Sequence, residues 1–502
     1  AIPSRLQGAG QPRCVTASSD EEKARFRLAL SFFDDCDSIF GSPDHLSEFP
    51  FFAHVPSTYI PNQAFRPFLK ALQLLGPILS NVSDFDHTRA WKAFLSLPAL
   101  ALSTKKDENK KKIIRSRLAT FCEGGFRDLA KDLPPNIRKV QTRSTGNAQA
   151  LREKQAIKHA EDRQFARSLR CLSHSNLLSV DDDVLDILKN KHPTRTSTDD
   201  FVMPVAGVDG VENDPIVIDP NMLADTLKSL NKNSSPGVFG WRYEFFLPLL
   251  ANEKKYPSLP IILEAFTDAF NIVLAGKISR EISSWLATSK LLPFAKSGGG
   301  VRPIAIGTGI RRVVSTLALR ASSRELRKAL GPCQFGVSVK NGVEYCIHKA
   351  RYDLLTSRKF LLVFDIKNAF NAVFRDAIFK QVSIAIPSLL PLVSLFYEHP
   401  SSLLLPGGQG LFSEEGTQQG DPLAPALFSL ALAPVLAKLA EDFQNFDLRA
   451  YLDDICVSSA HAEDLIDEFI PALKRELKGI GLELQISKSA LVVPEGAHCP
   501  DL

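Results

Sequence analysis

The amino-acid sequence predicts an α/β (α+β) domain that follows a mainly helical N-terminal region. The continuous apolar run at 360–364 is typical of a buried strand; it ends on Asp365, and a helical pattern follows it. A second short strand is expected at 448–451, close to the carboxylates Asp453 and Asp454. Residues 20–104 instead show helical stretches at 21–33, 65–79 and 88–97, separated by proline-rich turns and without alternating strands.

The length and composition are those of a globular protein with at least two structural regions. The chain has 502 residues, of which 44% are hydrophobic and 23% charged. Eight cysteines without a C-x-x-C pair are too sparse for a disulfide scaffold, which favours a reduced, intracellular protein without a structural zinc site. The apolar run at 384–395 is interrupted by prolines and is too short to cross a bilayer, so no membrane span is predicted.

The chain divides near residue 200. The stretch 191–220 is rich in Pro, Gly and Asp and predicts a linker between an N-terminal region at 1–200 and a second domain at 201–495. The sequence opens with Ala-Ile-Pro, shows no secretory signal pattern and stops soon after residue 495. It is therefore expected to be a piece of a longer polypeptide.

Two basic stretches are hidden by the small net charge of +4. Residues 105–170 carry 18 Lys and Arg against 8 Asp and Glu, which indicates either a phosphate-contacting arm or a solvated helical surface. Residues 277–328 carry 11 against 2 and contain an expected hairpin, with strands at 290–295 and 301–304. Lys296 and Arg302 flank its glycine-rich tip, where a triphosphate or a nucleic-acid backbone could bind, although a plain surface hairpin gives the same pattern.

Asp365, Asp453 and Asp454 are the candidate metal ligands. Carboxylates that follow apolar strands repel each other when they are ionised and buried, unless a cation compensates them. Oxygen ligands favour Mg²⁺ or Mn²⁺, and two such ions about 4 Å apart would suit phosphoryl transfer. An Asp-Asp pair taken alone is more often a solvated turn.

A glycine-containing loop at 415–425 precedes a strongly apolar helical pattern at 426–439. Gly420 would let the backbone approach a ligand closely, and Gln419 offers both a donor and an acceptor to a base or sugar. A purely structural loop at a helix N-terminus is the alternative.

Three segments in order resemble motifs A, B and C of reverse transcriptases: residues 364–371, 418–423 and 451–454. The Asn-Ala-Phe-Asn and Gln-Gly-Asp-Pro-Leu sequences are most similar to the non-LTR retrotransposon branch, although Leu452 stands where the family usually has Ala. Residues 234–241 resemble the family's P-G-x-D-G segment, with Phe239 in place of the acid. Arg302-Pro303-Ile304 resembles a fingers motif, and 481–488 resembles motif D, so that the resemblance covers about residues 215–495.

The resemblance implies a right-hand polymerase with palm and fingers, and with the thumb absent because the chain ends soon after motif D. It implies that Asp365 and Asp453 hold two Mg²⁺ ions with the help of Asp454, and that Lys488 protonates the departing pyrophosphate. The remaining implied roles concern the nucleotide: Phe370 as the steric gate against a ribose 2′-OH, Gln419 and Gly420 beside the nucleotide and template, and Arg302 with Lys296 on the triphosphate.

The function implied is RNA-directed DNA polymerisation by a retroelement protein, in the nucleus or in a cytoplasmic ribonucleoprotein. Its partners would be an RNA template, a DNA or RNA primer and deoxynucleoside triphosphates. Residues 1–200 show neither an endonuclease pattern nor a zinc knuckle. An RNA-dependent RNA polymerase is disfavoured by the bulky Phe370, and a non-catalytic RNA-binding protein is disfavoured by the retained carboxylates.

Overall fold

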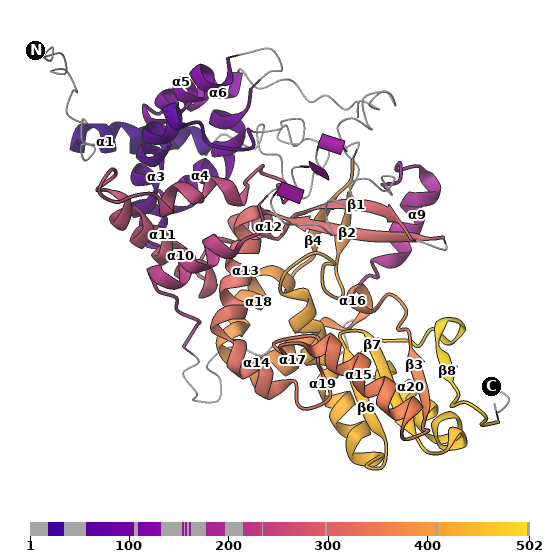
Figure 1. The fold of residues 1–502 in the computed structure, drawn as a ribbon. Coiled ribbons are helices and arrows are strands. Elements are labelled where there is room, and N and C mark those ends of the chain that lie inside the picture. Colours follow the sequence, from indigo (N-terminus) through magenta and orange to yellow (C-terminus); the bar gives the residue numbers. More distant parts are fainter. Residues whose placement is uncertain are drawn as a thin grey trace, which may run out of the picture. The chain divides into compact units, whose positions relative to one another are not determined.

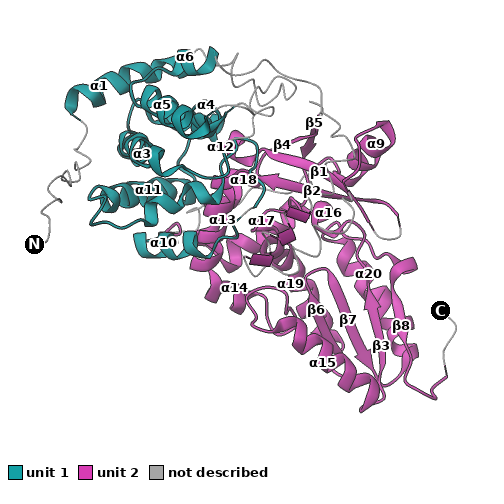
Figure 2. Ribbon diagram, turned by 45° about the horizontal axis from the view of Figure 1, so that its top comes forward, with its two compact units in different colours: residues 1–40, 50–134, 217–282 teal, residues 41–49, 135–216, 283–502 magenta. Residues whose placement is uncertain are grey.

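The computed structural model describes residues 19–34, 57–104, 109–131, 177–195, 214–232, 234–296, 299–406 and 410–498, with a few residues between 153 and 161. The chain forms two compact units, one of residues 1–40, 50–134 and 217–282, and the other of residues 41–49, 135–216 and 283–502 (Figure 2). This division differs from the boundary expected near residue 200, because residues 217–282 pack with the N-terminal helices. Most of the expected linker and of the basic arm lies outside the described residues.

Unit 1 is helical in its described part, as the sequence predicts. Its α-helices and 3₁₀ helices are α1 (Asp20–Ala29), η1 (Leu30–Phe33), η4 (Asn62–Ala64), α3 (Phe65–Leu79), α4 (His87–Leu102), α5 (Lys110–Cys122), α6 (Phe126–Lys131), α10 (Pro220–Ser229), η6 (Tyr243–Phe245), η7 (Leu247–Leu250) and α11 (Leu259–Leu274). Helix α12 (Arg280–Ala287) crosses the boundary to unit 2 at residue 282. The three expected helical stretches are confirmed by α1 with η1, by α3 and by α4.

Aromatic side chains form the centre of unit 1. The Trp241 ring lies 4.4 Å from that of Phe94 and stacks on Phe246 at 5.0 Å, and its Nε1–H donates to the Phe94 carbonyl at 2.9 Å. Phe239, which stands where the resembled segment has an acid, is also buried. A carboxylate there would be expensive to bury, so this segment packs as core.

Unit 2 contains the strands and the remaining helices. The strands are β1 (Ser289–Ala295), β2 (Val301–Gly307), β3 (Phe360–Phe364), β4 (Ser401–Leu404), β5 (Gly410–Ser413), β6 (Asp447–Tyr451), β7 (Asp454–Ser459) and β8 (Ala490–Val492). The helices are α9 (Asp182–Lys191), α13 (Gly309–Ala321), α14 (Ser323–Ala329), α15 (Gly342–Leu355), α16 (Ala369–Ala372), α17 (Arg375–Ala385), η8 (Pro387–Leu389), α18 (Leu390–Tyr397), α19 (Ala424–Asp442), the π-helix η9 (Asp464–Phe469), α20 (Ile470–Lys478) and η10 (Ile486–Lys488).

The described strands of unit 2 form two four-stranded sheets, ordered β2-β1-β4-β5 and β6-β7-β3-β8 (Figure 1). The expected hairpin is confirmed as the antiparallel pair β1 and β2. In the second sheet, the buried strand β3 pairs with β7 on one side and with β8 on the other. Helices α15 and α19 pack against this sheet, which therefore has an apolar face covered by helices.

Helix α19 is long and apolar enough to cross a membrane by length and composition. In the structure, 61% of its apolar window is buried, as is typical of a core helix. Pro425 suits its first turn, and Pro434 lies in its interior. Its N-terminus follows directly on the glycine-containing loop, so the buried helix holds the C-terminal end of that loop in place.

The Trp241 packing gives a test of unit 1. Trp241→Ala should lower the free energy of unfolding by about 3–5 kcal/mol, because a fully buried ring is removed from a close-packed core. Trp241→Phe keeps most of the volume and loses one hydrogen bond, so its cost should be nearer 1–2 kcal/mol. Urea denaturation followed by circular dichroism measures both, and equal midpoints for Trp241→Ala and the unsubstituted protein would contradict the packing described.

Candidate active site

One open pocket of unit 2 lies where β3 ends and where the turn between β6 and β7 begins. Six of the residues singled out from the sequence line it: Lys296, Asp365, Phe370, Gln419, Asp453 and Lys488. Arg302, Gly420 and Asp454 do not contribute to this lining. Lys191 lines the pocket as well, although nothing in the sequence pattern predicts it. Segments that are far apart in the chain therefore bring carboxylates, cations and an aromatic ring together.

The strand register brings the carboxylates to one end of the sheet. Strands β3 and β7 are antiparallel, with Phe364 opposite Ile455, so one further step of the same register sets Asp365 opposite Asp454. Directly opposed residues on an antiparallel pair have Cβ atoms about 5 Å apart. Asp453 lies in the turn that joins β6 to β7, where Tyr451 pairs with Asp454.

Repulsion and burial act on these carboxylates. Burial raises the pKa of Asp453, and the negative charges of Asp454 and Asp365 raise it further. Burial and Asp365 also raise the pKa of Asp454. Both directions show that the ionised forms are unfavourable in the protein alone.

The donor set suits a hard divalent cation. Among the described residues, no group of three Asp, Glu, His or Cys side chains forms a ready-made metal cage. Mg²⁺ is commonly held by one or two carboxylates, with waters and substrate phosphates completing its coordination. Asp365 and Asp453 line one pocket and repel each other, so they fit this mode of binding, whereas the exposed Asp454 lies beside the pocket.

The segment with Lys488 is tied to the strand end by its main chain. The Gln485 N–H donates to the Asp365 carbonyl at 2.8 Å, and the Lys367 N–H donates to the Glu483 carbonyl at 2.9 Å. An isolated bridge between Ile366 and Leu484 joins the same two segments. These contacts hold Lys488 at the pocket even though its side chain is exposed.

The loop at 415–421 is tied to its neighbours through its main chain. The Ala305 N–H on β2 donates to the Gln419 carbonyl at 2.8 Å, and the Thr417 N–H donates to the Phe370 carbonyl at 2.6 Å. Gly420 has φ +127°, and a Cβ added there would lie 2.3 Å from the Ala305 carbonyl oxygen. Only glycine allows this approach, so Gly420 brings Gln419 to the pocket without lining it.

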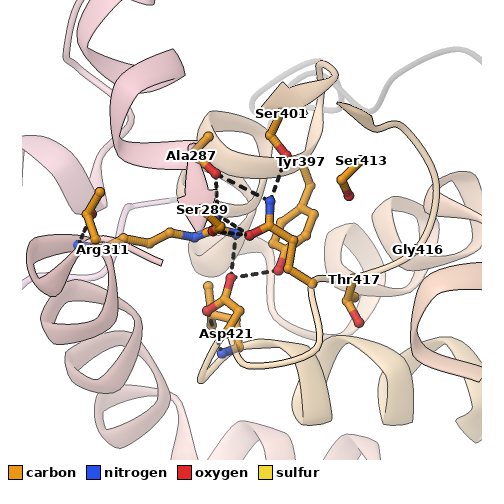
Figure 3. Close-up of polar contacts among 12 residues, drawn as sticks. Ala287, Ser289, Arg311, Tyr397, Ser401, Ser413, Gly416, Thr417 and Asp421 are labelled. Carbon is orange, nitrogen blue, oxygen red and sulfur yellow. Dashed lines mark hydrogen bonds and ion pairs between the residues drawn. The ribbon is translucent and has the colours of Figure 1, made fainter. Parts of the chain in front are cut away.

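A buried polar cluster supports this loop (Figure 3). The Arg311 guanidinium donates to Gln418 Oε1 at 2.9 Å and to Asp421 Oδ2 at 2.5 Å, and Tyr397 donates to the same Asp421 oxygen at 2.6 Å. Gln418 also accepts from the Ser289 hydroxyl at 2.5 Å. Burial alone would lower the pKa of Arg311, but Asp421 and Tyr397 raise it, so the arginine remains charged.

A second buried arginine holds the start of the loop. Arg375 donates to the carbonyls of Gly416 at 3.2 Å, Tyr397 at 2.8 Å and Ser413 at 2.9 Å, and its main-chain N–H donates to Glu415 at 2.8 Å. No local pattern in the sequence predicts either arginine. In the sequence, each of them is only a cation next to apolar positions of a helix. A helix with a solvated surface shows the same pattern, so the pattern does not identify a buried arginine.

Gln334 is a further residue that the sequence analysis missed. Its side chain is fully buried; Oε1 accepts from the Leu452 N–H at 2.9 Å, and Nε2 donates to the Leu452 carbonyl at 3.2 Å. Leu452 has φ +58°, which is unusual for a residue with a Cβ. The two hydrogen bonds stabilise this conformation, and with it the position of Asp453 in the turn.

Comparison with known proteins finds a family match over the part of the chain that supplies most of the pocket lining. Residues 294–498 match the family described as Reverse transcriptase (RNA-dependent DNA polymerase). A curated relative, the Retrotransposable element SLACS 132 kDa protein of Trypanosoma brucei gambiense, is 28% identical over 260 residues. The match covers 49% of this chain and 21% of the relative, so the chain spans about a fifth of that protein's length.

Two solved polymerase structures are distantly similar to this chain. Apo telomerase from Candida tropicalis is similar with a TM-score of 0.34 and 14% identity, over 42% of this chain and 44% of the telomerase. The RNA-dependent RNA polymerase of a human picobirnavirus, in an insertion-loop deletion mutant, is similar with a TM-score of 0.39 and 10% identity, over 70% of both chains.

The repulsion between the carboxylates predicts how stability responds to pH and to metal. The pKa values of Asp453 and Asp454 are raised on folding, so the folded protein binds protons more readily than the unfolded chain. The metal-free protein therefore loses stability as the pH rises from the ordinary pKa of an aspartate through the raised values. Without divalent cations at pH 7.5, Asp453→Asn should therefore melt at a higher temperature than the unsubstituted protein. The increase should be roughly 2–4 °C for each kcal/mol of unfavourable carboxylate energy that the substitution removes.

Mg²⁺ should reverse that order. It should raise the melting temperature of the unsubstituted protein and raise that of Asp453→Asn less, because the variant has lost a ligand. Asp442→Asn, which alters an exposed carboxylate at the end of α19, is the matched control and should respond to Mg²⁺ like the unsubstituted protein. Equal Mg²⁺ responses in all three proteins would contradict a metal site at Asp453.

Proposed function

We propose that this chain, whose residues 294–498 match the reverse transcriptase family, is the polymerase part of a retroelement protein that copies RNA into DNA with a right-hand polymerase fold. The observation that carries the proposal is the pocket that gathers Asp365, Asp453, Phe370 and Gln419 within the matched region. The reaction is the attack of a primer 3′-OH on the α-phosphate of a deoxynucleoside triphosphate, with release of pyrophosphate.

Asp365 and Asp453 provide the negative charge of the site. Two Mg²⁺ ions, when bound there, would neutralise the phosphates and stabilise the attacking and leaving oxygens. The chain's own part is to hold the two carboxylates in fixed positions, through the register of β3 with β7 and through the Leu452 turn held by Gln334. Asp454, beside the pocket, adds negative charge and assists as a further ligand.

Phe370 and Gln419 form the nucleotide side of the pocket. The Phe370 ring lies 5.0 Å from that of Phe428 on α19, and its carbonyl accepts from Thr417, so the ring has little freedom to move. A rigid aromatic wall beside the sugar would exclude a ribose 2′-OH and admit deoxyribose. The Gln419 side chain offers both donor and acceptor groups to the base or sugar.

Cations from separate segments would bind the phosphates of the nucleotide. Lys296 lies at the tip of the β1–β2 hairpin and lines the pocket, and Arg302 lies exposed at the other edge of that tip. Both are within the family match and would grip the triphosphate. Lys488, which the contacts of Gln485 hold near Asp365, would give its proton to the departing pyrophosphate.

The proposed partners are an RNA template, a DNA or RNA primer and deoxynucleoside triphosphates, inside the cell in the nucleus or in a ribonucleoprotein. The relationship to a retrotransposable element protein supports this setting. An RNA-directed RNA polymerase is less well supported, because a Phe370 ring that lines the pocket and packs on Phe428 would leave little room for a ribose 2′-OH.

Extension of a DNA primer on an RNA template in Mg²⁺ tests the proposal. Asp365→Asn and Asp453→Asn should each reduce the rate at least about a hundredfold, because several kcal/mol of charge stabilisation are lost. Asp442→Asn should leave it unchanged. Incorporation that survives Asp453→Asn, or that is absent from the unsubstituted protein, would refute the proposed reaction.

Phe370→Ala tests the choice of sugar. Removing the ring should improve the use of ribonucleotides relative to deoxynucleotides by roughly tenfold or more, because the steric barrier to the 2′-OH is lost. Phe412→Ala, an exposed phenylalanine on β5, is the control and should keep the original ratio. If the Phe370→Ala protein still rejects ribonucleotides, Phe370 is not the steric gate.

A further inference from the structure

The segment 177–195, which precedes the family match, packs on the β2-β1-β4-β5 sheet. The Leu178 N–H donates to the Pro293 carbonyl on β1 at 2.9 Å. Leu188 on α9 is fully buried in a cluster of apolar side chains from the sheet and the residues beside it: Leu291, Val301, Ala305, Leu403, Leu405 and Leu411. The helix is thus a fixed part of unit 2.

The C-terminal end of α9 reaches the pocket. The Asn368 side-chain amide, three residues after Asp365, donates to the Lys191 carbonyl at 2.8 Å. Asn368 itself has φ +52°, which turns the chain between β3 and α16. Beyond Lys191, the Arg195 guanidinium binds Asp376 and the Glu398 carbonyl, both at 2.9 Å. Lys191 is held between these attachments and lines the pocket.

Four lysines line this pocket: Lys191, Lys296, Lys367 and Lys488. Lys367 pairs with Glu483 at 3.1 Å, and the other three come from three separate segments. Burial lowers the pKa of Lys191, and the positive charges of Lys296 and Lys488 lower it further. In the part of the chain that the structure describes, no carboxylate forms an ion pair with Lys191. The Asp453 carboxylate offsets part of the charge of Lys296, which lowers the pKa of Asp453. The repulsion that remains among Lys191, Lys296 and Lys488 is unfavourable, and an anionic ligand in the pocket would relieve it.

We propose that Lys191 binds the triphosphate of the incoming nucleotide, as a third cation supplied by a segment outside the family match. This inference rests on the proposed function and adds to it a residue that neither the sequence motifs nor the matched region contains. A triphosphate is favoured over a nucleic-acid backbone because Lys191 shares the pocket with Asp365 and Asp453, the carboxylates proposed to face the reacting phosphate.

The alternative is that Lys191 only stabilises α9, since a cation in the last turn of a helix is favourable in itself. Lys189 separates the two explanations. It lies in the same last turn, is exposed and pairs with Asp186 at 3.1 Å. Lys189→Gln therefore removes a helix-end charge without altering the pocket, and is the matched control for Lys191→Gln.

The test measures binding and turnover separately. Equilibrium affinity is measured for inorganic tripolyphosphate with Mg²⁺, and for a deoxynucleoside triphosphate on a complex with RNA template and a chain-terminated primer. Lys191→Gln should weaken both by about tenfold and raise the nucleotide KM by a similar factor, as expected for one lost charge-assisted contact. Lys191→Arg should restore most of the affinity, and Lys189→Gln should match the unsubstituted protein.

Two results would overturn the inference. One is unchanged triphosphate affinity in Lys191→Gln, with a melting temperature equal to that of Lys189→Gln showing that both are folded. The other is a loss of template–primer affinity with a flatter salt dependence, which would assign Lys191 to the nucleic-acid backbone. Absence of incorporation by the unsubstituted protein would refute the proposed function instead, and tripolyphosphate binding would still report on Lys191.

Discussion

Repulsion between carboxylates at one end of a sheet is the constraint on which the rest of unit 2 depends. The antiparallel register of β3 with β7 brings Asp365 next to Asp454, and the short turn after β6 adds Asp453. Such an arrangement is unfavourable in the protein alone, as the raised pKa of Asp453 indicates. Cations and a phosphate ligand, as proposed above, would make it favourable. The fold would then keep a local instability at the position of the proposed substrate site.

The surrounding structure holds that position with buried polar groups. Arg311 and Arg375 use their guanidinium groups to tie the loop at 415–421 to two helices and a strand, and almost all of their partners are buried. Buried ion pairs of this kind contribute little net stability, but they allow few alternative arrangements. We consider their role to be the positioning of Gln419 and of the Phe370 carbonyl, which the loop contacts directly.

The sequence predicted the elements that carry local signals. The apolar run of β3, the β1–β2 hairpin and α19 have clear periodicity or turns, and the carboxylates were placed at strand ends by the same patterns. Short strands such as β4 and β5 were missed because four residues give too little periodicity. Gln334, Arg311 and Lys191 were missed for a different reason: each acts through contacts with residues far away in the sequence, and such contacts leave no local pattern. The packing of residues 217–282 with the N-terminal helices is non-local in the same way.

Cleavage of the polypeptide by bound iron locates a metal at Asp365 and Asp453 without relying on turnover. Fe²⁺ that replaces Mg²⁺ generates hydroxyl radicals in the presence of ascorbate and peroxide, and these cut the nearest main chain. We expect cuts close to Asp365 and close to Asp453, both suppressed by excess Mg²⁺ and both lost in Asp453→Asn. Cuts elsewhere in the chain, or cuts at these positions that Mg²⁺ does not suppress, would contradict a metal site formed by the two strand ends.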